Sequence, residues 1–191
     1  MKIPTPEQAR QLLGAIRPNE PFGARDFALI VLDLHTGLRA AELCGLDVAH
    51  VASQHGPREW LDLPAAIAKG GVGRRIPLNE TARKAICQIL RYNARHGFSV
   101  APGAPLLVTR DHQRLSTRSL RDRIQRYRER VDLDIRISPH SFRHSLASRL
   151  ARSCGNLRVV QQVLGHERLN TVEIYTHTDP QEMQEAMNQL G

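Results

Sequence analysis

The chain is 191 residues long; 41% of its residues are hydrophobic and 24% are charged. That length supports one domain, and that balance excludes disordered, collagen-like and fibrous proteins. No stretch approaches the roughly 18 consecutive apolar residues of a membrane-spanning helix, and the start at Met1 lacks the apolar core of a secretory signal. The three cysteines, Cys44, Cys87 and Cys154, fit a reducing compartment because they are far apart and odd in number. We therefore expect a cytoplasmic protein with no membrane partner.

Charge is the most informative part of the composition. The formal net charge is +8, and only three of the 27 cationic residues, Lys2, Lys69 and Lys84, are lysines. Arginine presents a planar fork that can bind phosphate through two hydrogen bonds. The bias therefore favours a polyanionic partner, most simply nucleic acid, over an arginine-rich surface that is merely solvated.

Three helices are predicted in the first part of the chain. Thr5-Pro6 supplies a cap and a proline at the first helical position, so a helix should begin there and stop before Pro18. Residues 24–34 are apolar nearly all round, which predicts a helix that is buried in the core and ended by Gly37. A short helix should follow over residues 39–46.

The middle of the chain predicts a small hairpin and two further helices. Residues 60–63 and 74–78 have the character of short strands around a glycine-rich turn at 69–73. Residues 81–92 and 116–131 carry apolar side chains at helical spacing. Arginines crowd the other faces of the second of these helices, which favours a face that follows DNA phosphates. The candidate DNA contacts on it are Arg118, Arg121 and Arg128.

The last part of the chain predicts three helices. Ser138-Pro139 repeats the pattern of a cap followed by proline, and Asn156 can cap a helix that ends at Gly165. A narrow apolar stripe marks a tail helix: Met183, Ala186, Met187 and Leu190. The expected fold class is α+β, mainly helical with a small antiparallel sheet. Residues 1–177 would form the domain and residues 178–191 the tail.

Two isolated features have simple structural explanations. His140 and His144 have the spacing of a helical metal pair, but Ser141 stands where the zinc-hydrolase motif has glutamate, and no third ligand is placed by spacing. We therefore predict no metal site. Cys44 lies among leucines and is expected to fill the core.

A third group of residues has the character required for DNA strand transfer. Phosphoryl transfer needs a nucleophile, donors to the non-bridging oxygens and an acid for the leaving oxygen. Arg39, His140, Arg143 and His166 are forked or titratable donors at predicted helix ends, where free backbone amides also favour anions. Tyr175 follows His166 by nine residues and can reach the same site.

These residues fall in segments that resemble the motifs of the tyrosine recombinase, or phage integrase, family. Thr36–Leu43 resembles the first arginine box, and Ala68–Leu78 is similar to the β-hairpin segment that carries a lysine. Pro139–Ser145 resembles the H-x-x-R box, and Leu164–His177 resembles the box that carries the nucleophile. The four segments appear in the family's order with compatible spacing, and Thr5–Glu7 resembles the usual opening of its catalytic domain.

The resemblance implies that two arginines hold the scissile phosphate. Arg39 and Arg143 would clamp it, and Glu42 would orient Arg39. Lys69, carried into the minor groove by a mobile hairpin, would protonate the departing 5′ oxygen. A neighbouring arginine, Arg74 or Arg75, is the alternative residue that could contact the phosphate from this hairpin.

The resemblance also implies the remaining chemistry. His140 would assist acid–base steps, His166 would hydrogen-bond the phosphate, and Tyr175 would attack to leave a 3′-phosphotyrosine. Because that ester retains the phosphodiester energy and side chains supply the cations, neither ATP, a metal nor another cofactor is expected.

The implied function is site-specific recombination or integration of double-stranded DNA through a Holliday junction, as a homo-tetramer on synapsed DNA and a monomer or weak oligomer when free. A bacterial, nucleoid-associated location is expected. The alternatives are a type IB topoisomerase and a catalytically silent DNA-binding relative. The spacing from Leu164-Gly165-His166 to Tyr175 favours the recombinase, and a silent relative would be expected to lack one of the six catalytic residues.

Two departures from the family pattern are visible. No residues remain for the helical core-binding domain that usually precedes the catalytic domain, so the chain corresponds to the catalytic domain alone or to the short recombinases of fimbrial switches. Ser145 stands where threonine is common, a polar exchange of no expected consequence. The tail helix is expected to dock on a neighbouring protomer, with packing on its own domain as the alternative.

Overall fold

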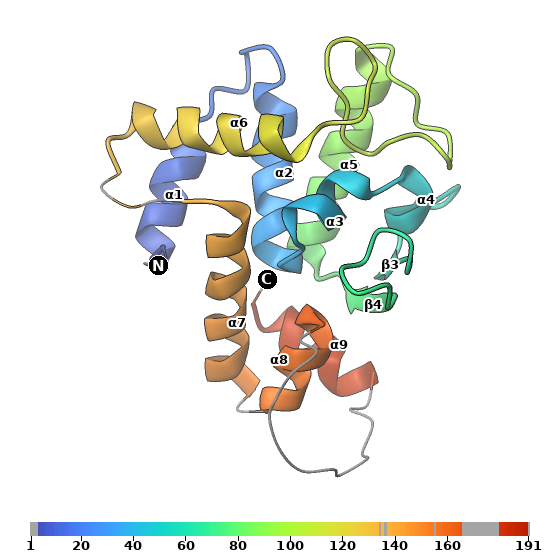
Figure 1. Ribbon diagram of the computed structural model, residues 1–191, viewed down its shortest axis with the longest axis vertical. Helices are drawn as coiled ribbons and strands as arrows, with labels where there is room; N and C mark the ends of the chain where they lie inside the picture. Colours follow the sequence, from blue (N-terminus) through green and yellow to red (C-terminus); the bar gives the residue numbers. More distant parts are fainter. Residues whose placement is uncertain (1–3, 134, 136, 155, 166–179, 191) are drawn as a thin grey trace.

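The computed structural model describes residues 4–133, 135, 137–154, 156–165 and 180–190. Its helices are α1 (Pro6–Gly14), α2 (Gly23–Thr36), α3 (Ala40–Gly45), α4 (Val48–Val51), α5 (Glu80–Arg95), α6 (Thr117–Arg130), α7 (Pro139–Cys154), α8 (Leu157–Leu164) and α9 (Pro180–Asn188). Helix α2 is central, with α5 packed along it and α7 against it, and α6 crosses one end of this group (Figure 1). Helices α8 and α9 pack on α7 at the other end.

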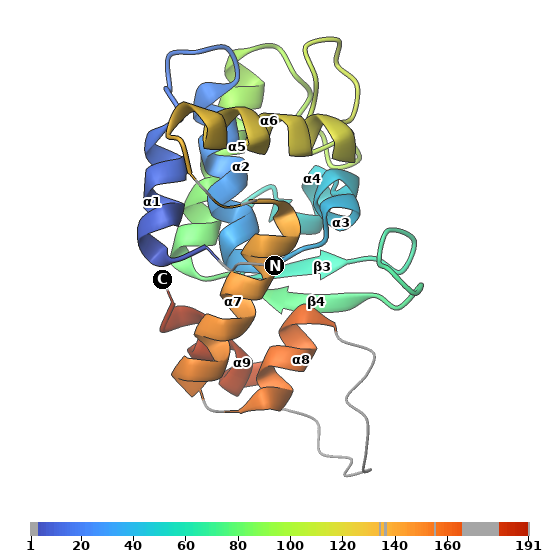
Figure 2. The same ribbon diagram turned by 60° about the vertical axis from the view of Figure 1, so that its left-hand side comes forward.

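Two small antiparallel sheets complete the described fold. Their strands are β1 (Ala52–Ser53), β2 (Gly56–Pro57), β3 (Trp60–Leu63) and β4 (Arg74–Pro77). Strand β3 pairs with β4 so that Leu61 lies opposite Ile76, and both side chains are buried. The β3–β4 hairpin lies between the α2–α6 end of the molecule and the α7–α9 end (Figure 2). The expected mainly helical α+β class with a small antiparallel sheet is confirmed.

Local capping chemistry explains most of the helix boundaries. Thr5 and Gln8 form a reciprocal capping box at α1, and Asn79, Ser116 and Asn156 accept backbone hydrogen bonds at the starts of α5, α6 and α8. The predicted helices and the predicted hairpin are all present, although α1 ends earlier and α5 continues further than expected. Helix α4 and the β1–β2 pair have no counterpart in the sequence-based prediction.

Gly37 brings three helices together. It ends α2 with φ +58°, and a Cβ at this position would lie 2.8 Å from a side-chain methyl carbon of Leu164 and 2.9 Å from one of Leu146. Only glycine fits both the left-handed backbone and this close approach. The end of α2, which leads directly to Arg39, is therefore packed on α7 and α8.

The tail helix α9 packs on its own domain in this single chain. Met183, Ala186 and Met187 are buried, and α9 contacts α7, α8 and β4. Asn79 donates a hydrogen bond to the carbonyl of Met187 at 3.0 Å, and Arg149 donates one to the carbonyl of Leu190 at 2.7 Å. Among the described helices, none is long and apolar enough to span a bilayer.

Candidate active site

A buried carboxylate, that of Glu42 on the first turn of α3, organises the candidate site. Its side chain is 1% exposed and accepts two hydrogen bonds from Arg39, one from the backbone N–H and one from the guanidinium, each at 3.0 Å. The two contacts fix both the backbone and the side chain of Arg39 at the start of α3. The Arg39 side chain remains 26% exposed, so part of its donor fork faces outward.

Arg74 of strand β4 binds the same carboxylate through a fork-to-fork pair. Its two terminal nitrogens lie 3.1 and 2.8 Å from the two oxygens of Glu42. Burial alone would raise the pKa of the Glu42 carboxyl, but hydrogen bonds from Arg74 and Arg39 lower that pKa to about 2. Glu42 is therefore charged at neutral pH and ties the hairpin to α3.

Lys69 is anchored through its backbone while its side chain is exposed. Its N–H donates to Glu42 Oε1 at 3.3 Å, and the neighbouring Ile67 packs against Gly45 of α3. Gly70 and Gly71 follow with positive φ angles of 83° and 72°. Within the described residues, no ion pair holds the Lys69 ammonium group. The backbone of Lys69 is thus fixed beside Arg39, and its flexible side chain is free to extend outward.

Arg143 lies at the start of the second turn of α7 and is only 3% exposed. It donates hydrogen bonds to the backbone carbonyl of Gly37, at 2.9 Å, and to that of Leu164. These carbonyls lie at the C-terminal ends of α2 and α8, respectively. Burial, followed by repulsion from Arg39 and Arg74, lowers the pKa of Arg143 to about 10. The guanidinium is still charged at neutral pH, and the three arginines concentrate positive charge at one place.

His140 stands one turn from His144 on the exposed part of α7. The Nε2 atoms of the two rings are 3.0 Å apart and the rings meet edge to face. Burial and the nearby His144, Arg143 and Arg39 lower the pKa of His140. The imidazole is therefore neutral at neutral pH and can accept a proton. In the part of the chain that is described, no group of three metal-ligating side chains includes this pair.

Gly165 allows the end of α8 to approach the Arg74 side chain. Its φ is +64°, and a Cβ here would lie 2.9 Å from Cδ of Arg74. The end of α8 at Gly165 therefore lies directly beside the arginine that binds Glu42. His166 and Tyr175 themselves lie outside the described residues. Arg74 was left among alternatives by the sequence analysis; its position shortly after the glycine-rich turn was the available signal.

The arginines of α6 differ in how far the domain itself binds them. Arg123 and Arg130 are held by Asp26 and Glu20, at 2.6 and 2.7 Å. Arg118 and Arg121 are exposed. Arg128 is half-buried, and its guanidinium donates to the carbonyl of Ile135 at 3.3 Å. Part of its hydrogen-bonding capacity is therefore used within the domain.

Arg121 also lies on the side of α6 that faces α3. It is close enough for its charge to act on Cys44 of α3, a thiol whose pKa burial raises to about 12. Cys44 fills the core as expected. Helix α6 packs on α3, the helix that carries Glu42.

The family model described as the phage integrase family matches residues 3–182. The chain belongs to this family. It is 35% identical over 184 residues to tyrosine recombinase XerC of Vibrio campbellii, covering 96% of this chain and 56% of that protein. It is 36% identical over 187 residues to XerC of Natranaerobius thermophilus, covering 95% and 60%. The chain therefore spans little more than half the length of these relatives.

Solved structures of phage integrase family members share the fold. The crystal structure of XerA recombinase superposes with a TM-score of 0.71 at 24% identity, covering 100% of this chain and 66% of that chain. The pre-cleavage complex of XerH recombinase with its difH substrate gives a TM-score of 0.68 at 21% identity, covering 87% and 47%. The catalytic core of lambda integrase gives 0.65 at 17% identity, covering 87% and 96%.

Proposed function

We propose that this chain cleaves and rejoins double-stranded DNA in site-specific recombination, with Tyr175 as the nucleophile. The observation that carries the proposal is the cluster around Glu42. Three separate segments of the chain bring four residues to one place: Arg39 at the start of α3, Lys69 between β3 and β4, and His140 with Arg143 on α7. Such a cluster of fixed cations suits a phosphodiester that gains negative charge during reaction.

The proposed steps follow from this arrangement. The scissile phosphate binds between Arg39 and Arg143, whose charges stabilise the pentacoordinate state. The phenol oxygen of Tyr175 attacks phosphorus while His140 accepts its proton, and the bond to the 5′ oxygen breaks. Lys69 donates a proton to that leaving oxygen, and His166 hydrogen-bonds a phosphate oxygen. The resulting 3′-phosphotyrosine keeps the bond energy, and attack by the 5′ hydroxyl of the partner strand reverses the step.

We propose double-stranded DNA as the partner and a tetramer on synapsed DNA as the active assembly. The DNA complexes solved for XerH and for the Tn1549 transposon integrase support the first part. The tail helix α9 is the candidate element for contact between protomers: in the single chain it packs on α7, α8 and β4, and in the tetramer it would occupy the same groove of a neighbouring protomer. Because the proposed partner is DNA, we expect the protein to be located at the bacterial nucleoid.

The nucleophile is tested by trapping the covalent intermediate. With a suicide substrate nicked near the scissile phosphate, the unaltered chain should form a covalent protein–DNA adduct on a denaturing gel, and Tyr175→Phe should form none while binding DNA normally. Tyr92→Phe is the matched control, because Tyr92 bonds the backbone of Phe22 and lines no part of the Glu42 cluster. An adduct with Tyr175→Phe would show that another residue attacks.

The DNA-binding face is tested through salt dependence. Arg118→Ala combined with Arg121→Ala should weaken binding on many sequences and lower the slope of log affinity against log salt by about one per lost phosphate contact. Arg130→Ala should leave that slope unchanged, because Arg130 is paired with Glu20. Equal slopes for all three proteins would mean that α6 does not follow phosphates. Arg128→Ala measures whether its remaining donors reach DNA.

A further inference from the structure

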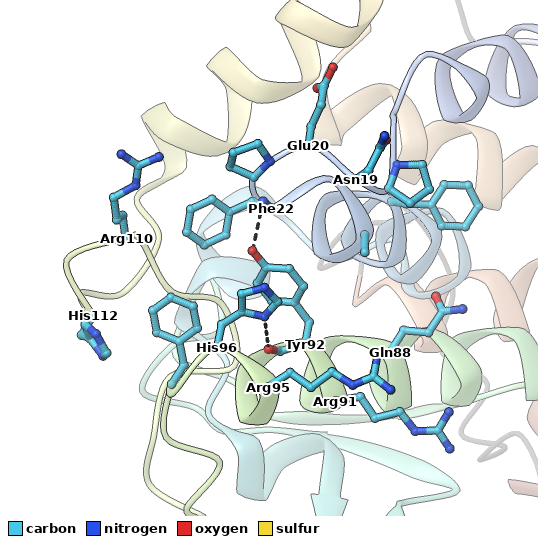
Figure 3. Close-up of a pocket in the computed structure, with 15 residues that line it drawn as sticks. Asn19, Glu20, Phe22, Gln88, Arg91, Tyr92, Arg95, His96, Arg110 and His112 are labelled. Atoms are coloured by element: carbon cyan, nitrogen blue, oxygen red, sulfur yellow. Dashed lines mark hydrogen bonds between the residues drawn. The ribbon is translucent and has the colours of Figure 1, made fainter.

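An open hollow of about 1060 Å³ is lined by none of the candidate catalytic residues that the structure describes. It is bounded by the loop that precedes α2, the C-terminal end of α5 and the loops near Phe98 and His112 (Figure 3). No residue of the Glu42 cluster lines it. The proposed recombination chemistry therefore leaves this hollow without a role.

Aromatic side chains form the floor of the hollow. The ring of Phe22 lies 5.8 Å from that of Tyr92 and 6.1 Å from that of Phe98, measured between centroids. With Val108 these residues form a small apolar cluster that is separate from the main core. The floor can thus receive an apolar group without any rearrangement of the domain interior.

The position of Phe22 is fixed from several sides. Its φ is +65°, a left-handed conformation that is strained for a bulky side chain. The backbone N–H of Phe22 donates to the hydroxyl of Tyr92 at 3.0 Å (Figure 3). The guanidiniums of Arg25 and Arg123 lie 4.2 and 5.0 Å from its ring centroid. These contacts hold the floor in one shape, as expected of a preformed binding site.

The rim of the hollow carries positive charge that is not compensated within the described residues. Arg91 and Arg95 are one turn apart on α5, and Arg110 stands across the hollow from them (Figure 3). All three are exposed, and none of them forms an ion pair in the described part of the chain. The acidic residue of the lining, Glu20, is already paired with Arg130 at 2.7 Å.

We propose that this hollow is a docking site for an acidic segment of a partner protein, anchored by one aromatic or large aliphatic side chain. The arginine rim would bind the carboxylates and the floor would bury the anchor. A second copy of this chain is a poor occupant, because its formal net charge is +8. Single-stranded nucleic acid is disfavoured because Phe22 and Phe98 are recessed, 8% and 9% exposed, and present no open faces on which bases could stack.

The test uses a defined probe, a fluorescein-labelled peptide of nine residues with one central Phe among Asp and Glu. Fluorescence anisotropy in about 50 mM salt should give a dissociation constant below about 1 mM. Replacing the central Phe by Ala, or the acidic residues by Asn and Gln, should weaken binding at least about fivefold in each case. Equal affinity for all three peptides would overturn the proposal.

Two double variants locate the peptide on the protein. Arg91→Gln with Arg95→Gln should weaken peptide binding at least about tenfold, with an unchanged melting temperature and DNA affinity. Arg118→Gln with Arg121→Gln removes the same charge from exposed positions on α6 and should change peptide affinity less than about twofold. If the second pair, and not the first, abolishes binding, the peptide sits on the proposed DNA face and the proposal is wrong.

A labelled nine-nucleotide oligo-dT distinguishes the other macromolecule. The oligonucleotide should depend on Arg118 and Arg121 and be indifferent to Arg91 and Arg95. Loss of oligonucleotide binding in the Arg91→Gln, Arg95→Gln variant, together with peptide binding that this variant leaves unchanged, would identify the hollow as a nucleic-acid site and would overturn the docking of a protein segment.

Discussion

Two buried carboxylates gather arginines in this protein, and they differ in what they leave exposed. Asp26 at the start of α2 accepts hydrogen bonds from Arg25 at 2.8 Å, from Arg123 at 2.6 Å and from the hydroxyl of Tyr127 at 2.8 Å. Glu42 on α3 accepts from Arg39 and Arg74. Each carboxylate is almost completely buried, and each joins segments that are distant in the sequence.

The partners of the two carboxylates reveal the difference. The Arg25 side chain is fully buried, and it also donates to the carbonyl of Val108 and covers the ring of Phe22. Arg39, in contrast, keeps 26% of its side chain exposed beside the exposed Lys69. A closed cluster stabilises the fold, whereas an open one presents fixed cations to a ligand. The two carboxylates have the same charge and almost the same burial, so these two properties alone do not distinguish the closed cluster from the open one.

The largest expected effect comes from opening the closed cluster. Asp26→Asn leaves Arg25 and Arg123 without their anion, so the free energy of unfolding should fall by about 3–5 kcal/mol. Chemical denaturation measures this loss. Asp62→Asn is the matched control: its pair with Arg75 is exposed, and about 1 kcal/mol or less should be lost. DNA cleavage per folded molecule should be unchanged by Asp26→Asn; a specific loss of cleavage would contradict the comparison.

A smaller effect, on catalysis, should follow from altering the open cluster. Glu42→Gln replaces the anion by an amide that cannot accept from Arg39 and Arg74 at both of its ends. Misplacement of Arg39 should slow suicide-substrate cleavage by up to about 100-fold at saturating DNA, with DNA affinity changed much less.

Glu80→Gln provides the control for Glu42→Gln. Glu80 is an exposed glutamate paired with Lys84 at 2.7 Å, and its replacement should leave cleavage unchanged. If Glu42→Gln cleaves at the rate of the unaltered chain, Glu42 stabilises the fold, as Asp26 does, and does not position Arg39 for cleavage.

The smallest effect concerns a third carboxylate, that of Asp33, which has no arginine. It is fully buried, and neither oxygen has a hydrogen-bond partner among the residues that the structure describes. Burial raises the pKa of Asp33 well above its usual value near 3.8, although the charge of Arg143 opposes this. The folded state therefore binds this proton more tightly than the unfolded state, and stability declines as the pH rises above about 3.8 toward the folded pKa.

Asp33→Asn removes this titration. The variant should gain stability relative to the unaltered chain as the pH rises from about 4 to 8, because only the unaltered chain loses a proton on unfolding in this range. Denaturation at a series of pH values measures the difference. A difference that does not change with pH would mean that the carboxyl does not titrate on unfolding in this range.

The sequence predicted much of the candidate site, and the gaps have a physical cause. Arg39, Lys69, His140 and Arg143 stand in short motifs, and the structure brings these four residues together. His166 and Tyr175 stay predictions, as do the catalytic roles of all six residues. Arg74 was named only as one of two alternatives to Lys69, and its pairing with Glu42 was not predicted, because the local sequence around an arginine does not indicate which distant carboxylate it will bind.

The sequence by itself determined several of the helix boundaries, and it also determined which family the four motif segments resemble. Caps, prolines and glycines act over a few residues, so Thr5, Gly37 and Asn156 could be interpreted without a structure. Only the tertiary structure decided which arginines of α6 pair with distant carboxylates. Arg123 pairs with Asp26 97 positions away and Arg130 with Glu20 110 positions away, while Arg118 and Arg121 stay exposed on the same helix. Pairing over such separations depends on how the helices pack, and no local pattern in the chain records it.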